Sequence, residues 1–154
     1  MGIAMNILMV LVFMVVAKMP AATGWEAQDA YMAILGQTPR IVLASMVAYF
    51  AGEFSNSYLL AKIKIKTEGK WLWLRTILST IVGEGLDTVL FVTIAFYGVL
   101  PNELLFAIML WNYVFKVGVE VLFTPFTYLI VKFLKKSEGV DIFDKDTNFN
   151  PFKL

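Results

Sequence analysis

The sequence predicts an all-α protein, a polytopic transmembrane helix bundle with about four spans. The chain has 154 residues, of which 59% are hydrophobic and only 16% charged. A soluble domain carries about 25% charged residues. The mean hydropathy of the chain is +0.73. Its apolar residues fall into four runs, each close to the roughly 20 residues that a helix needs to cross a bilayer.

The predicted spans cover residues 1–17, 41–61, 76–100 and 104–133. The first run lacks the basic start and the small-residue cleavage pattern of a signal peptide, so we expect it to remain as a helix. The last run is long enough to be tilted, or to be kinked at Pro125. We therefore expect one transmembrane domain over residues 1–136. Residues 137–154 are expected to form a polar, loosely ordered cytoplasmic tail.

The connections between the runs predict the orientation of the spans. The loop after the second run is basic, and so is the start of the tail, with Lys62, Lys64, Lys66, Lys70, Arg75, Lys132, Lys135 and Lys136. The stretch 19–39 contains two acids and no Lys or Arg. The positive-inside rule then places both termini in the cytoplasm of a multi-pass protein of the cell (inner) membrane. Lys18 and Arg40 lie near the outer boundary and depart from this pattern.

The Lys62–Lys66 segment alternates lysine and isoleucine with a period of two. Such a pattern is compatible with a short strand or with an extended segment on the membrane surface. The alternative is a basic cytoplasmic loop that only fixes the topology. The sequence leaves both interpretations open.

Ionisable side chains lie inside the predicted spans, where each charged group costs a few kcal/mol or more. The acids are Glu53, Glu84, Asp87 and Glu120, and the only base at this depth is Lys116. Such an excess indicates protonated carboxylates, a wet cavity, or a ligand that supplies hydrogen-bond donors. All three conditions fit a transport path better than a purely structural bundle.

Several of these residues also have a structural explanation. Lys116 and Glu120 are four residues apart and could neutralise each other. Glu53 lies within about two turns of the basic loop and could extend its carboxylate toward it. A functional role is favoured most for Glu84 and Asp87, which share a helix face in the middle of an apolar run without a cation. Their small neighbours could serve only helix packing, namely Ser79, Thr80 and Gly83.

The chain has no Cys and no His. This excludes disulfides, thiol catalysis, Cys-ligated metals and every nucleophile that depends on a histidine base. A membrane-embedded enzyme would have to use Glu84 and Asp87 as an acid pair, which no other signature supports. We therefore expect no enzyme activity, no metal and no cofactor. A P-loop is also absent from the sequence, so ATP-driven transport would need a separate partner.

Ordered motifs between residues 38 and 136 carry a family resemblance. They are Gly52-Glu53-Phe54-Ser55-Asn56-Ser57, Lys70-Trp71-Leu72-Trp73-Leu74-Arg75, Gly83-Glu84-Gly85-Leu86-Asp87-Thr88 and Asn112-Tyr113-Val114-Phe115-Lys116. With this spacing the chain resembles the queuosine precursor transporters, also called the vitamin uptake transporter family. The resemblance implies six spans in full-length relatives, of which this chain matches the later four. The family's usual N-terminal region has no counterpart in the sequence.

The resemblance implies import of 7-deazaguanine precursors of the tRNA nucleoside queuosine, such as 7-cyano- and 7-aminomethyl-7-deazaguanine. The ring N–H and exocyclic amine of such a base lie side by side, so one carboxylate can accept both hydrogen bonds. Glu84, Asp87 or Glu53 is the candidate for this role. The remaining candidate substrate-binding residues are Asn56, Asn112 on the carbonyl side of the base, Lys116, and the stacking rings of Tyr49, Phe91 and Tyr113.

Lys116 is expected to balance the charge of this site by pairing with Glu120 or Asp87, and Arg75 is a further base at the rim. The expected partners are a purine-like small molecule and the lipid bilayer, without nucleic acid, and a homo-oligomer remains open. The alternative function is that of a substrate-binding membrane subunit in a multi-component vitamin importer. Such a subunit would co-purify with an ATPase module. A structural protein with a satisfied polar core is the remaining alternative.

Overall fold

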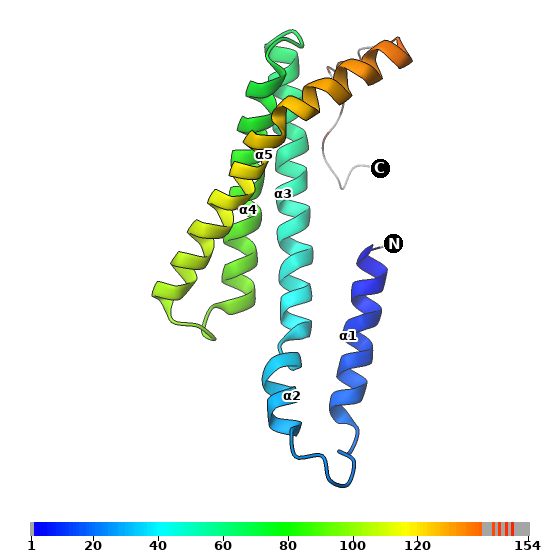
Figure 1. Ribbon diagram of the computed structural model, residues 1–154, viewed down its shortest axis with the longest axis vertical. Coiled ribbons are helices and arrows are strands. Elements are labelled where there is room, and N and C mark those ends of the chain that lie inside the picture. Colours follow the sequence, from blue (N-terminus) through cyan, green and yellow to red (C-terminus); the bar gives the residue numbers. More distant parts are fainter. Residues whose placement is uncertain (1, 140–142, 144, 146, 148, 150–154) are drawn as a thin grey trace.

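The computed structural model describes residues 2–139 together with residues 143, 145, 147 and 149. Within this part the named elements are five α-helices: α1 Gly2–Lys18, α2 Gln28–Leu35, α3 Thr38–Lys66, α4 Leu72–Phe96 and α5 Asn102–Glu138. Helix α4 packs against both α3 and α5, and α1 packs on α3 (Figure 1). The predicted all-α fold is therefore confirmed.

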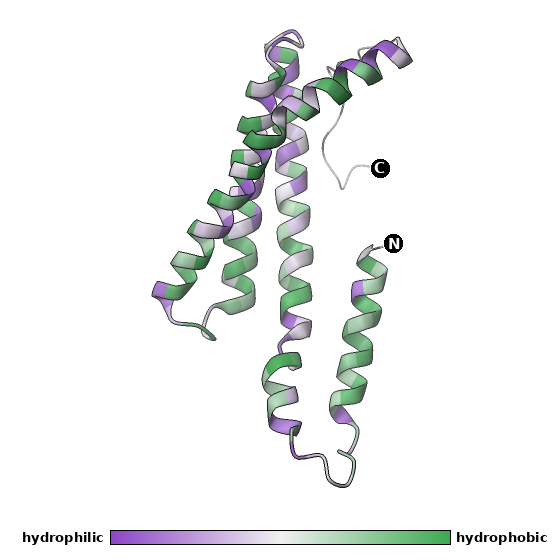
Figure 2. Ribbon diagram, viewed as in Figure 1, coloured by the Kyte–Doolittle hydropathy of each residue, from purple (hydrophilic) through white to green (hydrophobic). Residues whose placement is uncertain are grey.

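Three of the helical segments are long and apolar enough to cross a membrane. They are residues 28–66, which join α2 and α3, followed by α4 and α5. Helix α1 is apolar but has only 17 residues, slightly fewer than the roughly 20 of a typical span. Figure 2 shows ribbons that are mostly hydrophobic, with hydrophilic segments at helix ends and in the upper half of α3 and α4. The chain is thus a polytopic helical membrane protein.

Helix α3 extends further than the sequence pattern suggested. Its last residue is Lys66, so the Lys62–Lys66 segment is helical. Its interpretation as a strand or an extended segment is wrong, and so is its assignment to a loop. Lys64 and Lys66 lie in the last turn, where the partial negative charge of a helix C-terminus favours cations. Glu53 consequently lies near the middle of α3, well before its last residue. The expectation that Glu53 is within two turns of the loop is also wrong.

Other element bounds differ from the prediction by a few residues. Helix α2 lies in the stretch that was read as a loop. Helix α4 begins and ends four residues early. It ends at Phe96 because Tyr97 is extended and Gly98 adopts a φ of +78°. Helix α5 includes Ser137 and Glu138, which were assigned to the tail. It changes direction in the orange part of the chain (Figure 1). Helix α5 also contains Pro125, a residue type that kinks helices. Most of the rest of the predicted tail lies outside the described residues.

Small residues bring α3 and α4 into close contact. Ala44, Ala48 and Gly52 recur every fourth residue on α3 and are buried, and Gly83 is buried on the facing side of α4. A Cβ atom added to Gly83 would lie 2.8 Å from the Cβ of Asn56 and 3.0 Å from the Gly52 carbonyl oxygen. Small residues of this kind allow membrane helices to pack backbone to backbone. Gly83 is therefore a close-packing residue of the bundle.

Two side chains from neighbouring helices bind the ends of α4. The Arg40 guanidinium donates to the carbonyl oxygens of Ile94 and Tyr97, each at 2.6 Å. At the opposite end, the Trp73 amide donates to the Tyr128 hydroxyl at 3.0 Å. Backbone groups at helix ends lack partners within the helix, and these contacts supply them. Capping of α4 thus explains why a cation, Arg40, lies at the end that the charge pattern predicts to be external.

Replacement of Arg40 by Met tests this capping role. Arg40→Met removes two charged hydrogen bonds from a partly exposed site, so we expect the free energy of unfolding to fall by about 1–2 kcal/mol. Chemical unfolding of the purified protein in detergent micelles would measure it. Lys18→Met is the matched control, because it removes a cation from the last turn of another helix, α1. Equal stability of the two variants would contradict the capping role.

Candidate functional site

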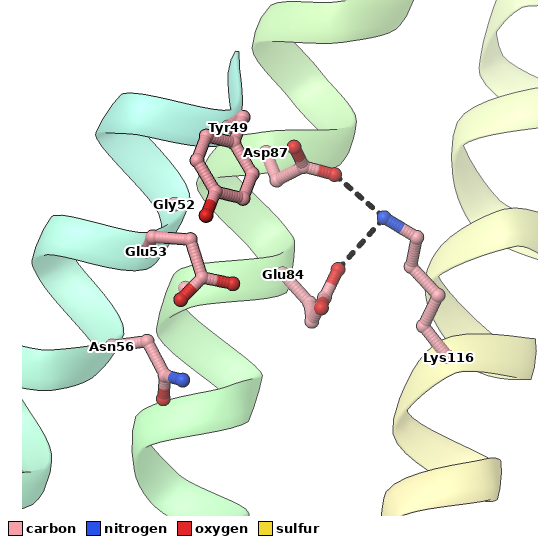
Figure 3. Close-up of a pocket in the computed structure, with 8 residues that line it drawn as sticks. Tyr49, Gly52, Glu53, Asn56, Glu84, Asp87 and Lys116 are labelled. Atoms are coloured by element: carbon pink, nitrogen blue, oxygen red, sulfur yellow. Dashed lines mark hydrogen bonds and ion pairs between the residues drawn. The ribbon is translucent and has the colours of Figure 1, made fainter. Parts of the chain in front are cut away.

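A polar cavity of about 180 Å³ lies between α3, α4 and α5. Its lining residues are Tyr49, Gly52, Glu53, Asn56, Gly83, Glu84, Asp87 and Lys116. Figure 3 shows side chains from α3 on one side of this cavity and the linked side chains of Glu84, Asp87 and Lys116 on the other. The structure thus brings together six of the side chains that the sequence singled out, from three separate helices.

The cavity lies halfway along the helices. Glu84 is the central residue of α4, and Glu53 lies close to the centre of α3. At about 1.5 Å of rise per residue, each carboxylate is roughly 18–22 Å from the helix ends. In helices that cross a bilayer, the central position is the one at which an unpaired charge is most costly. Substrate sites of secondary transporters commonly lie at this depth.

Lys116 joins α5 to two carboxylates of α4. Its ammonium nitrogen lies 2.7 Å from Glu84 Oε2 and 2.6 Å from Asp87 Oδ2. The two acids are three residues apart, so the helical repeat directs both to the same face of α4. The side chains of Lys116, Glu84 and Asp87 are 34%, 35% and 25% exposed. This network retains one formal negative charge, because a single ammonium faces two carboxylates.

The structure decides which acid neutralises Lys116. The sequence allowed Glu120 or Asp87, and the observed partners are Asp87 and Glu84. Among the described residues, Glu120 makes no ion pair with Lys116 and is half-buried one turn further along α5. Contact across the α4–α5 interface thus replaces the local pairing within α5.

Two side chains on the α3 side of the cavity carry hydrogen-bond acceptors that have no partner among the described residues. Glu53 is exposed at the cavity rim, and no ion pair or hydrogen bond reaches its carboxylate from the residues that the structure describes. The Oδ1 atom of Asn56, one turn further along α3, is buried and also lacks a hydrogen-bond partner in this part of the chain. The α3 side of the cavity thus differs from the opposite side, where Lys116 pairs with both acids of α4.

The other candidate residues lie outside the cavity lining. The Tyr113 hydroxyl donates to the Ile81 carbonyl oxygen at 3.2 Å, and its ring borders an apolar groove between α4 and α5. Phe91 makes an edge contact with Phe96. Arg75 is 5% exposed in the first turn of α4. Asn112 is half-buried on α5, one turn before the cavity-lining lysine. The structure does not bring these four residues into the cavity.

Two lining residues were missed as part of the site. Gly52 and Gly83 form the floor of the cavity where α3 and α4 cross. The sequence did contain a signal for Gly52, because small residues recur once per turn of α3 up to this glycine. Asn56 is the next residue at the same spacing. No cluster of acids that could hold a metal ion occurs within the described ranges.

Comparison with known proteins identifies the family. Residues 1–130 match the family model described as "Putative vitamin uptake transporter". The chain belongs to this family of membrane transporters. The assignment indicates a non-enzymatic role in a multi-pass membrane protein, in agreement with the sequence motifs.

A curated relative of this chain is a protein of Bacillus subtilis (strain 168) named "Probable queuosine precursor transporter". The two sequences are 30% identical over 113 residues, which cover 73% of this chain and 49% of the relative. The chain therefore spans about half the length of the relative that it matches. No solved structure matches the chain significantly.

Proposed function

We propose that the chain forms the substrate cavity of an importer of queuosine precursors, which are 7-deazaguanine bases. The observation that carries this proposal is the group of three carboxylates and one lysine at mid-depth in a single cavity. Ionisable side chains at membrane depth mark substrate pathways in membrane proteins. The name of the Bacillus subtilis relative supports the choice of substrate.

The chemistry of the cavity suits a deazaguanine base. The adjacent ring N–H and amine of the base would donate to the two oxygens of Glu84, while Lys116 holds that side chain in place from α5. The cavity volume of about 180 Å³ is below the roughly 300 Å³ at which pockets for drug-sized ligands begin. Such a volume favours a free base over a nucleoside. The ring of Tyr49, at the edge of the cavity, is available for stacking on the base.

The charge distribution favours an orientation with the α3–α4 connection in the cytoplasm. Basic residues of α3 and of that connection, including Lys62, Lys66 and Lys70, lie at the same end of the bundle as the C-terminal end of α5 (Figure 1). The last turn of α5 adds Lys135 and Lys136. By the positive-inside rule this end faces the cytoplasm of the cell (inner) membrane. The substrate then enters from the end at which α4 meets α5.

The variant Glu84→Gln tests the proposed function. The amide keeps the size of the side chain but cannot accept two hydrogen bonds from the base, so we expect uptake to fall by at least about 100-fold. Uptake would be measured as queuosine formed in tRNA of cells that cannot make the precursor but are supplied with it. The control Glu103→Gln removes an exposed acid in the first turn of α5, outside the cavity. Normal uptake by Glu84→Gln at equal membrane abundance would reject the assignment.

A further inference from the structure

The cavity carries more negative charge than a neutral deazaguanine can balance. Its lining contains three carboxylates against one ammonium. Lys116 pairs with Glu84 and Asp87 at 2.7 and 2.6 Å, so its single positive charge is already outweighed by two carboxylates. The adjacent N–H groups of a base can satisfy one carboxylate by hydrogen bonds, but they bring no positive charge. The formal excess of negative charge therefore persists when a neutral base is bound.

The excess is located on the α3 side of the cavity. Glu53 has no ion-pair or hydrogen-bond partner among the described residues, and the buried Oδ1 atom of Asn56 lacks one as well. The two residues are three apart and so lie on the same face of α3. Figure 3 shows the Glu53 side chain extending from α3 toward the network of α4 and α5. The Glu53 carboxylate at the rim of the cavity can accept hydrogen bonds from a group with several N–H donors and a positive charge.

We propose that this cavity selects a planar heterocycle bearing an ammonium group over its neutral analogues, with Glu53 as the acceptor of the ammonium. The inference rests on the proposed function, in which Glu84 binds the edge of the base. The ammonium has three donors, and charge-assisted hydrogen bonds are roughly twice as strong as neutral ones. The 7-aminomethyl deazaguanine base is a cation at neutral pH, because an aliphatic amine has a pKa of about 10. The 7-cyano base is neutral.

The test compares the binding of these two bases to the purified chain in lipid nanodiscs. We expect 7-aminomethyl-7-deazaguanine to bind at least about 10-fold more tightly than 7-cyano-7-deazaguanine, because only the former supplies charge-assisted hydrogen bonds. Glu53→Gln should reduce that ratio to less than about 3-fold, mainly by weakening the aminomethyl base. Glu103→Gln, which changes an exposed acid outside the cavity, should leave the ratio unchanged.

The possible outcomes separate this inference from the proposed function. Equal or tighter binding of the cyano base would overturn the inference and leave the proposed function intact. An unchanged preference in Glu53→Gln would also overturn it, because the selectivity would then come from another residue. Failure of both bases to bind the wild-type chain would reject the proposed function, and the inference with it. Glu53 is exposed, so folding of its glutamine variant can be verified by its unchanged thermal unfolding.

Discussion

Replacing Lys116 by methionine should destabilise the protein and abolish uptake. The substitution leaves Glu84 and Asp87 facing each other at mid-depth without a cation. Removal of one partner from a fully buried ion pair costs about 3–5 kcal/mol. Here the side chains are between 25% and 35% exposed, so we expect a loss of about 1–3 kcal/mol in the free energy of unfolding. Unfolding in detergent micelles would measure the loss.

A triple variant distinguishes charge imbalance from lost packing. Lys116→Met combined with Glu84→Gln and Asp87→Asn removes all three charges, so it should recover most of the lost stability but not the uptake. Lys132→Met is the matched control, because this lysine is exposed on the same helix. If Lys116→Met proves as stable as Lys132→Met, the ion-pair network does not hold α5 on α4.

The second large effect is expected at the crossing of α3 and α4. A Cβ atom at Gly83 would lie 2.8 Å from the Cβ of Asn56 and 3.0 Å from the backbone of Gly52. Gly83→Ala must therefore push the two helices apart, at a cost of about 1–3 kcal/mol in the free energy of unfolding. It should also lower uptake, because the crossing forms the floor of the cavity. Unfolding in micelles and queuosine formation in tRNA would measure the two effects.

Gly85→Ala is the control for this prediction. It lies in the same helix, and an added Cβ would meet only the Tyr113 ring at an ordinary 3.6 Å. Both variants gain the same helix propensity, about 1 kcal/mol for an exchange of Gly for Ala. The difference between them thus isolates the contact between α3 and α4. Equal stabilities would show that the helices do not approach as closely as the structure indicates.

Helix content and membrane insertion followed from the sequence because both depend on local hydrophobicity. The long apolar runs are α-helices, with ends that differ from the prediction by a few residues. The Lys62–Lys66 segment was harder to predict. Its residues alternate with the period of a strand, but they form the last part of helix α3. The alternation covers only five residues, and these residues continue the long helix that begins at Thr38.

The composition of the site was visible in the sequence, but its pairing was not. Lys116 was equally compatible with Glu120 on its own helix and with Asp87 on another, because sequence spacing does not reveal which helix faces which. Packing through Gly52 and Gly83 places α3 against α4, and the ion pairs of Lys116 join α5 to the same cavity. For the same reason Tyr113 could not be located, since its hydroxyl contacts the backbone of α4.

We expect a carboxylate in this cavity to accept hydrogen bonds from the adjacent ring N–H and amine groups of a guanine-type base. Competition for the uptake of labelled 7-cyano-7-deazaguanine into membrane vesicles containing the protein tests this role most directly. Guanine presents adjacent N–H and amine donors, whereas adenine presents an amine beside a ring acceptor, so adenine would leave the carboxylate half unpaired. We predict that guanine inhibits uptake at a concentration at least about 100-fold lower than adenine. Equal inhibition by the two bases would contradict this role of the carboxylate.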